Sequence, residues 1–230
     1  VNVYLDQYVP GWRYLPRWLT RPLDAEWLLK DVSNRGVSNN AAELGAITEA
    51  ILLGQHGPQA REGEQLIHFL TRELKPDAII FSNVMLCGEV ERLKAAFPGP
   101  VFCTLQGDDI FLDGLTEPHR TRVFERLRPI VDRLDGFLVH SRFYAEFMQK
   151  YLSVPAEKFH QLPLGIECHE HTGVPRPAGE PPTIGYFARL APEKGLRELV
   201  EAALILQKRS VNFRVLAGGY LNPQQPAYWN

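Results

Sequence analysis

The segment GFLVHSRFYAEFMQKYLSVPAEKFHQLPLG, residues 136–165, decides the fold class. An apolar, strand-like run at 136–140 leads into a helical pattern that ends near residue 152, and Ser141 stands where a helix N-cap is expected. A second strand-like run follows at 159–165. A strand, a helix and another strand in this order form a unit whose strands lie parallel. The segment therefore predicts an α/β protein with a parallel sheet.

The same alternation extends towards the N-terminus. The patterns predict strands at 77–83 and 100–105, and helices at 40–54, 59–74, 86–97 and 117–133, the last kinked or interrupted at Pro129. In the predicted helix 59–74, one apolar face is formed by Leu66, Ile67, Leu70 and Leu74. The alternation favours a doubly covered parallel sheet, with helices on both faces.

Ligands of such sheets bind at the edge formed by the carboxyl ends of the strands. The candidate substrate-binding residues are therefore those that follow strands, namely Asn83, Gln106, Gly107, Asp109, Ser141 and Gly165, with Gly218 in the second domain. The loop QGDDIFLDG also carries Asp108 and Asp113. Its carboxylates could bind a metal or act as a base, or they could be ordinary loop and N-cap residues.

Residues 165–182 break the alternation with a run of prolines and glycines, which predicts a linker. We expect an N-terminal Rossmann-like domain at 1–164 and the start of a second at 183–230, with a strand at 183–188, a helix at 193–208 and a strand at 212–219. The linker contains the string CHEH at 168–171. Its spacing favours a solvated segment over a zinc site, because adjacent residues of an extended chain point to opposite sides.

The segment IGYFARLAPEKG, residues 184–195, places Arg189 and Lys194 where a strand passes into a helix. Such a turn presents backbone N–H groups and the positive end of the helix dipole, which suit phosphate. A forked guanidinium and an ammonium would fit a diphosphate. The spacing alone does not distinguish a phosphate site from the alternative, in which the two side chains are surface cations that are solvated or ion-paired.

Composition narrows the function classes. A formal net charge of −2 gives no electrostatic reason to expect a nucleic-acid partner, and no apolar stretch is long enough to cross a bilayer. Three widely spaced cysteines favour reduced thiols, so we expect a cytoplasmic location. Three tryptophans alternate with basic residues between positions 12 and 35. With the arginines of 117–133 they could make a peripheral membrane contact, or the tryptophans could pack inwards.

Two motifs together resemble family 4 retaining glycosyltransferases. IGYFARLAPEKGLRELVEA at 184–202 resembles the start of their second domain, and VHSRFYAEFMQKYLSVPAEKFHQLPLGIE at 139–167 resembles the segment that closes their first. TLQGDDIFLDGL at 104–115 resembles the loop after a first-domain strand. The first two motifs cover about a fifth of the chain.

The resemblance implies a GT-B fold, in which the first domain takes the acceptor and the second binds a nucleotide-diphosphate sugar. The family's arginine and lysine at the donor diphosphate fall on Arg189 and Lys194, which would be the catalytic pair, acting without a metal or other cofactor. A histidine common in the family is replaced by Gln106. The family's glycine-rich loop and glutamate pair have no match here, so we expect a longer natural protein and an inactive fragment. The alternatives are a non-catalytic GT-B-like binding module and a nucleotide-sugar epimerase. The donor sugar, the acceptor and the oligomeric state are not specified by the sequence.

Overall fold

The computed structural model describes residues 41–169, 173 and 179–220, together with Val9, Gly11, Leu15, Pro16 and Leu19. Most of the tryptophan-rich stretch and part of the proposed linker lie outside the described residues. The chain divides into two compact units, Val1–Gly165 and Ile166–Asn230, each described by itself below.

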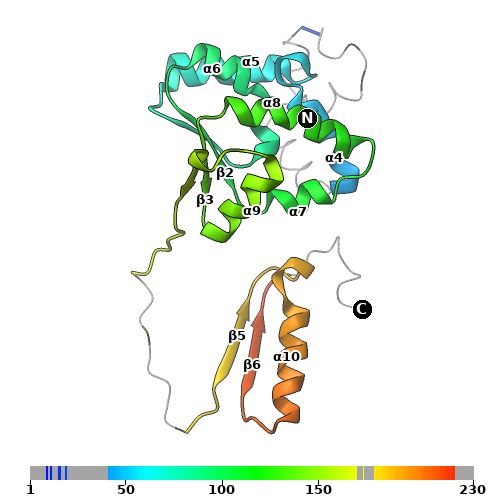
Figure 1. Ribbon diagram of the computed structural model, residues 1–230, viewed down its shortest axis with the longest axis vertical. Coiled ribbons are helices and arrows are strands. Elements are labelled where there is room, and N and C mark those ends of the chain that lie inside the picture. Colours follow the sequence, from blue (N-terminus) through cyan, green and yellow to red (C-terminus); the bar gives the residue numbers. More distant parts are fainter. Residues whose placement is uncertain are drawn as a thin grey trace. The chain divides into compact units, whose positions relative to one another are not determined.

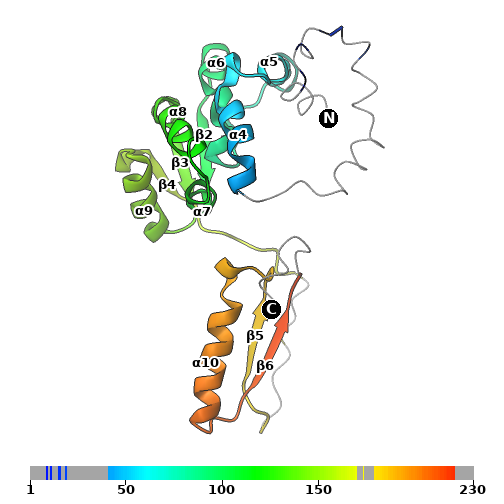
Figure 2. The ribbon, with the colours of Figure 1, turned by 90° about the vertical axis from the view of Figure 1, so that its right-hand side faces the viewer.

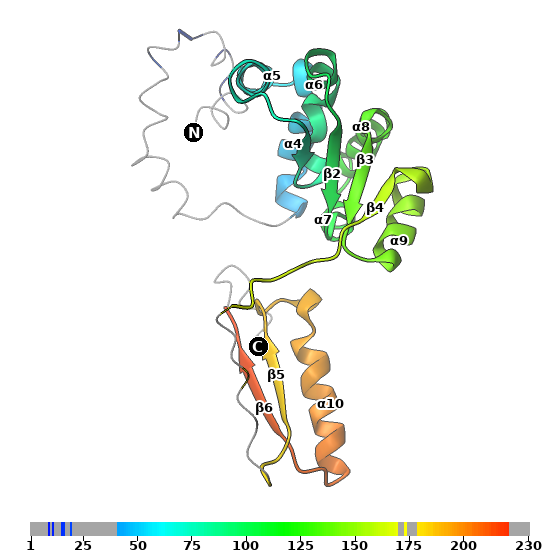
Figure 3. The ribbon, with the colours of Figure 1, turned by 90° about the vertical axis from the view of Figure 1, so that its left-hand side faces the viewer.

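The first unit contains a four-stranded parallel sheet in the order β1-β2-β3-β4. Its strands are β1 (Ile79–Phe81), β2 (Val101–Leu105), β3 (Gly136–Val139) and β4 (Phe159–Gln161). Figure 3 shows β2, β3 and β4 side by side, with α9 next to β4. The unit is therefore of the α/β class that the sequence predicts, and its sheet is compatible with a Rossmann-like domain.

The helices of this unit precede, connect and follow the strands (Figure 1). They are α4 (Ala41–Leu52), η3 (Gly54–His56), α5 (Ala60–His68), η4 (Phe69–Leu74), η5 (Val84–Glu89), α6 (Val90–Ala96), α7 (Asp108–Asp113), α8 (His119–Arg133), α9 (Arg142–Leu152) and η6 (Ala156–Lys158). Helix α4 packs against α8 (Figure 2).

The two faces of the sheet are covered unequally. Val101, Cys103 and Leu105 alternate to one face and are fully buried there. On the opposite face, Ile80 is 55% exposed. The strand order follows the chain order, and right-handed crossovers in that order place the connecting helices on a single face. The described residues thus differ from the expected covering of both faces.

Several predicted elements differ in detail. The predicted helix at 59–74 is α5 followed by η4, a π-helix. Leu66 and Leu74 are 54% and 57% exposed whereas Ile67 is buried, so the predicted single apolar face is wrong. Beyond Phe69 the π turn also shifts the helical period. Helix α8 continues through Pro129 without interruption. Its neighbours Leu127 and Ile130 are buried, so packing holds the helix across a proline that lacks an N–H donor.

Strand lengths are also shorter than predicted. β1 has three residues where 77–83 was expected, and β4 ends at Gln161 where 165 was expected. Both strands lie at the ends of the four-strand order, so within the described part of the chain each is paired along one side only. The predicted helix at 86–97 is divided between η5 and α6.

The second unit contains β5 (Thr183–Phe187), η7 (Pro192–Lys194), α10 (Leu196–Lys208) and β6 (Arg214–Gly218). β5 and β6 pair in parallel, and α10 runs alongside them in all three ribbon views. Among its described residues only Leu190 and Ala191 are buried hydrophobic side chains, whereas Phe187 is 93% exposed. One strand pair and one helix leave much of the apolar surface of this unit uncovered.

Candidate functional site

The parallel register brings the predicted edge residues of the first unit together. Asn83 follows β1, Gln106 and Gly107 follow β2, and Ser141 follows β3, so they lie on adjacent loops at one edge of the sheet. The Gln106 side chain is exposed, and its Nε2 donates to the backbone oxygen of Ser82 at 3.4 Å. This bond links the loops after β1 and β2.

Asp108 connects the two loops of this edge by hydrogen bonds. It is 3% exposed, and its carboxylate accepts hydrogen bonds from the backbone N–H of Val84 at 2.8 Å and of Gln106 at 3.0 Å. Burial raises the pKa of the Asp108 carboxyl, and the backbone hydrogen bonds oppose that shift. Both carboxylate oxygens accept hydrogen bonds from loop backbone N–H groups. The structure therefore favours a role for Asp108 in holding the loop over a role as a metal ligand.

Tyr144 joins three of the predicted residues. Its Oη donates to Asp109 Oδ1 at 2.5 Å and accepts from the N–H of Gly107 at 2.9 Å. Its backbone N–H donates to Ser141 Oγ at 3.2 Å, which confirms Ser141 as the N-cap of α9. Burial, and then the bond to Asp109, raise the pKa of the Tyr144 phenol, so the hydroxyl keeps its proton at neutral pH.

Position 107 favours glycine because of its backbone conformation and not because a side chain would clash there. Its φ is 101°, a left-handed value that side-chain-bearing residues rarely adopt, and an added Cβ would meet only Ile110 Cδ1 at 3.8 Å. The turn at Gly107 directs its N–H to Tyr144 and starts α7 at Asp108. Gly165 is different, because it lies in the exposed segment after β4 and an added Cβ would meet nothing within 4 Å.

Asn83 carries an unused polar atom at this edge. Its Oδ1 is buried and has no hydrogen-bond partner among the described residues, although the residue as a whole is only half-buried. A buried oxygen without a partner costs about 1–3 kcal/mol, so such atoms call for an explanation such as a bound water or ligand. Asn83 therefore carries an unused acceptor just below the surface of this edge.

In the second unit, Arg189 and Gly218 lie at the same edge of the β5–β6 pair. Phe187 pairs with Gly218, and the N–H of Ala188 donates to the oxygen of Gly218 at 3.2 Å. Arg189 is exposed, and its Nη2 contacts Glu193 Oε1 at 3.5 Å. This contact lies at the limit of a hydrogen bond and leaves the guanidinium accessible.

Lys194 occupies the turn that leads into α10. Its side chain is exposed at the end of η7, and Gly195 follows with a φ of 72° as the N-cap of α10. Gly218 is packed closely, since an added Cβ would come to 3.3 Å from Phe187 Cδ2. At the next position an added Cβ would clash with the backbone oxygen of Ala188, so a glycine is required at Gly219, which the sequence reasoning did not select.

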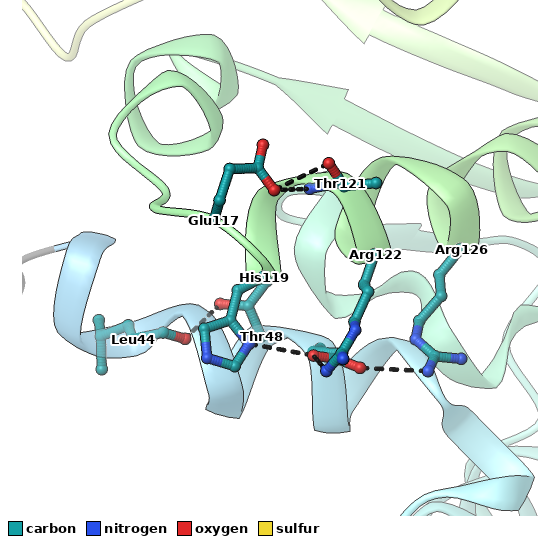
Figure 4. A network of polar contacts seen from close by, with 8 residues as sticks. Leu44, Thr48, Glu117, His119, Thr121, Arg122 and Arg126 are labelled. Carbon is teal, nitrogen blue, oxygen red and sulfur yellow. Dashed lines mark hydrogen bonds and ion pairs between the residues drawn. The ribbon is translucent and has the colours of Figure 1, made fainter.

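Sequence reasoning also missed Tyr144 and the carboxylate of Glu49. Glu49 on α4 lies between cations of α8, at 3.0 Å from His119 Nδ1, 3.3 Å from Arg126 Nη2 and 3.6 Å from Arg122 Nη1. Figure 4 shows these three side chains projecting from α8 towards α4. Two of the arginines that the sequence offered for membrane contact are thus used inside the unit, and the contact itself stays a prediction.

A scan against protein-family models and a search of curated proteins found no match to this sequence. Among the described residues, no helix combines the length and apolar character that crossing a membrane requires. The described part of the chain also contains no group of three or more histidine, cysteine or acidic side chains that could hold a metal ion. In the proposed linker, His169 Nε2 pairs with Glu167 at 2.8 Å and Cys168 is exposed.

Proposed function

We propose that the chain is part of a retaining glycosyltransferase of GT-B architecture, which moves a sugar from a nucleotide-diphosphate donor to an acceptor. The observation that carries the proposal is the placement of Arg189, Lys194 and Gly218 around one edge of the β5–β6 pair. An exposed guanidinium follows one strand, a glycine ends its neighbour, and an exposed ammonium precedes a helix.

The chemistry of this edge suits a leaving diphosphate. Arg189 can donate two parallel hydrogen bonds to phosphate oxygens, and Lys194 adds a compact positive charge. Fixed positive groups that face the leaving group stabilise the negative charge that develops on the diphosphate as its bond to the anomeric carbon of the sugar breaks. In this proposal the two side chains take the role that a divalent metal has in enzymes that stabilise phosphate charge with a metal ion.

The first unit would supply the acceptor side. Gln106 offers an exposed amide, and Asn83 lies on the adjacent loop. The Asp109–Tyr144 pair fixes the loop that carries Gly107. Amide and carboxylate groups on adjacent loops suit a polyhydroxylated acceptor, because each hydroxyl both donates and accepts. Gly165 and Ser141 would act through the backbone and the helix cap.

Binding of nucleoside diphosphates tests the donor half of the proposal. We expect titration calorimetry with UDP, GDP and ADP to detect binding of at least one to the natural protein. Arg189→Ala and Lys194→Ala should each weaken that binding about tenfold, the loss of roughly one charge-assisted contact. Arg197→Ala is the matched control, because Arg197 is also exposed in this unit but pairs with Glu201 along α10. Unchanged affinity in both test variants would remove the assigned role.

Assays of turnover distinguish the proposed transferase from an epimerase and from a non-catalytic binding module. The proposal expects transfer from a nucleotide sugar by the natural protein only when an acceptor is present. An altered sugar produced from the donor alone would indicate an epimerase. Nucleotide binding with no turnover of any common donor would indicate a non-catalytic binding module.

A further inference from the structure

A small cavity in the first unit lies away from the sheet edge described above. It has a volume of about 250 Å³ and lies between the end of α4 with η3, the start of α6 and the second half of α8. None of the predicted edge residues lines it. Its lining combines apolar residues, among them Leu52, Val90 and Ile130, with Arg92, Arg126 and Arg133.

Positive charge dominates the lining. The three arginines stand against a single acid of the lining, Glu91, whose side chain is 56% exposed and already pairs with Arg133 Nη2 at 3.3 Å. Apolar residues combined with a few polar groups are the usual composition of a ligand site.

The arginines retain hydrogen-bonding capacity. Arg92 Nη1 donates to the oxygen of Ala60 at 2.8 Å, and Arg133 Nη1 donates to the oxygen of Pro129 at 2.9 Å. Arg126 Nη2 contacts Glu49 at 3.3 Å, while Arg126 Nε is buried without a partner. A guanidinium carries five N–H donors, so the contacts among the described residues occupy only part of each.

We propose that this cavity binds a small organic oxyanion, a phosphate monoester or a carboxylate on an apolar body about the size of a phenyl ring. The anionic group pairs with the arginines, which bind planar or tetrahedral oxyanions through parallel hydrogen bonds. The apolar body rests on the aliphatic part of the lining and loses contact with water. The volume is just below the usual range for drug-sized ligands, so the ligand is small.

The opposing explanation is that the arginines serve the fold alone. Arg133 lies in the last turn of α8, where a cation offsets the partial negative charge of the helix end. Arg92 pairs with Glu89 at 3.8 Å. These roles account for the arginines but predict no saturable ligand binding, which makes the two explanations separable.

The test titrates the chain with phenyl phosphate, benzoate and inorganic phosphate while amide chemical shifts are recorded. We expect phenyl phosphate or benzoate to bind saturably, with a dissociation constant on the order of 1 mM or tighter for so few atoms. The perturbed amides should fall at 88–92 and 126–133. Inorganic phosphate should bind about tenfold more weakly, because it lacks an apolar body. The tighter of the two organic probes identifies the preferred anionic group.

Arg133→Met should weaken binding about tenfold, and Arg126→Lys, which keeps the charge and loses the fork, by less. Arg128→Met is the matched control, since Arg128 is an exposed arginine of the same helix that does not line the cavity. Arg133 is 41% exposed, so its removal should leave the fold intact, as circular dichroism can verify. The proposal is overturned if no probe binds saturably, or if Arg133→Met and Arg128→Met bind equally well. Neither result depends on the proposed transferase activity.

Discussion

Replacing Glu49 by glutamine should destabilise the first unit by about 2 kcal/mol at neutral pH. The Glu49 side chain is only 15% exposed and lies within 3.0–3.6 Å of three cationic or ionisable side chains. Breaking a fully buried pair costs about 3–5 kcal/mol, and an exposed pair contributes about 0.2–1 kcal/mol. The partners here are 30%, 33% and 53% exposed, so solvent screening places this site between the two limits.

The effect should depend on pH in a defined direction. Burial by itself would raise the pKa of the Glu49 carboxyl, but the hydrogen bonds from His119 and Arg126 and the charges of Arg122 and Arg126 outweigh it and hold the pKa below its ordinary value. A carboxyl with a lowered folded-state pKa stabilises the fold above its unfolded pKa of about 4.3, and this contribution is lost as pH falls through the folded value. The difference between wild type and Glu49→Gln should therefore be full at pH 7 and shrink below about pH 4.3.

Urea unfolding followed by far-ultraviolet circular dichroism between neutral and acidic pH measures both quantities. In a thermal melt at neutral pH, the melting temperature should fall by about 4–8 °C for a unit of this size. Glu146→Gln is the matched control, because Glu146 pairs with Arg142 at 2.8 Å but both side chains are largely exposed. That control should change stability by no more than about 0.5 kcal/mol. Equal effects of the two substitutions at pH 7, or a Glu49→Gln effect that persists unchanged in acid, would refute the reasoning.

Two further predictions concern the sheet edge and the thiols. Tyr144→Phe should lower the unfolding free energy by about 1–2 kcal/mol, because it removes the bonds to Asp109 and to the backbone N–H of Gly107. A thermal melt of the variant measures this loss, and unchanged stability would show that the phenol does not stabilise this edge. A thiol reagent should modify Cys168 rapidly in the native chain, because Cys168 is exposed, and should modify the two buried cysteines only after unfolding. Mass spectrometry of the native chain measures the three rates, and equal rates would contradict the prediction.

The sequence by itself determined the elements whose signal is local. Ser141 caps α9 because a serine hydroxyl three residues before Tyr144 can reach its N–H, whatever the rest of the fold. The run at 101–105 became β2 because its apolar residues alternate to a buried face. The parallel arrangement followed from the alternation of strands and helices, and it placed Asn83, Gln106 and Ser141 at one edge.

Only the tertiary structure decided what those residues contact. Glu49 is an acid in an apolar helix, and its partners His119 and Arg126 are 70 and 77 positions away, beyond any local pattern. Asp108 and Asp109 are adjacent in the chain, yet one braces backbone groups and the other bonds to a phenol 35 positions away. Propensity and periodicity act over a few residues, whereas burial, pairing and pKa depend on which segments the fold brings together. For that reason the sequence located the sheet edge but gave no indication of the arginine-lined cavity between α4, α6 and α8.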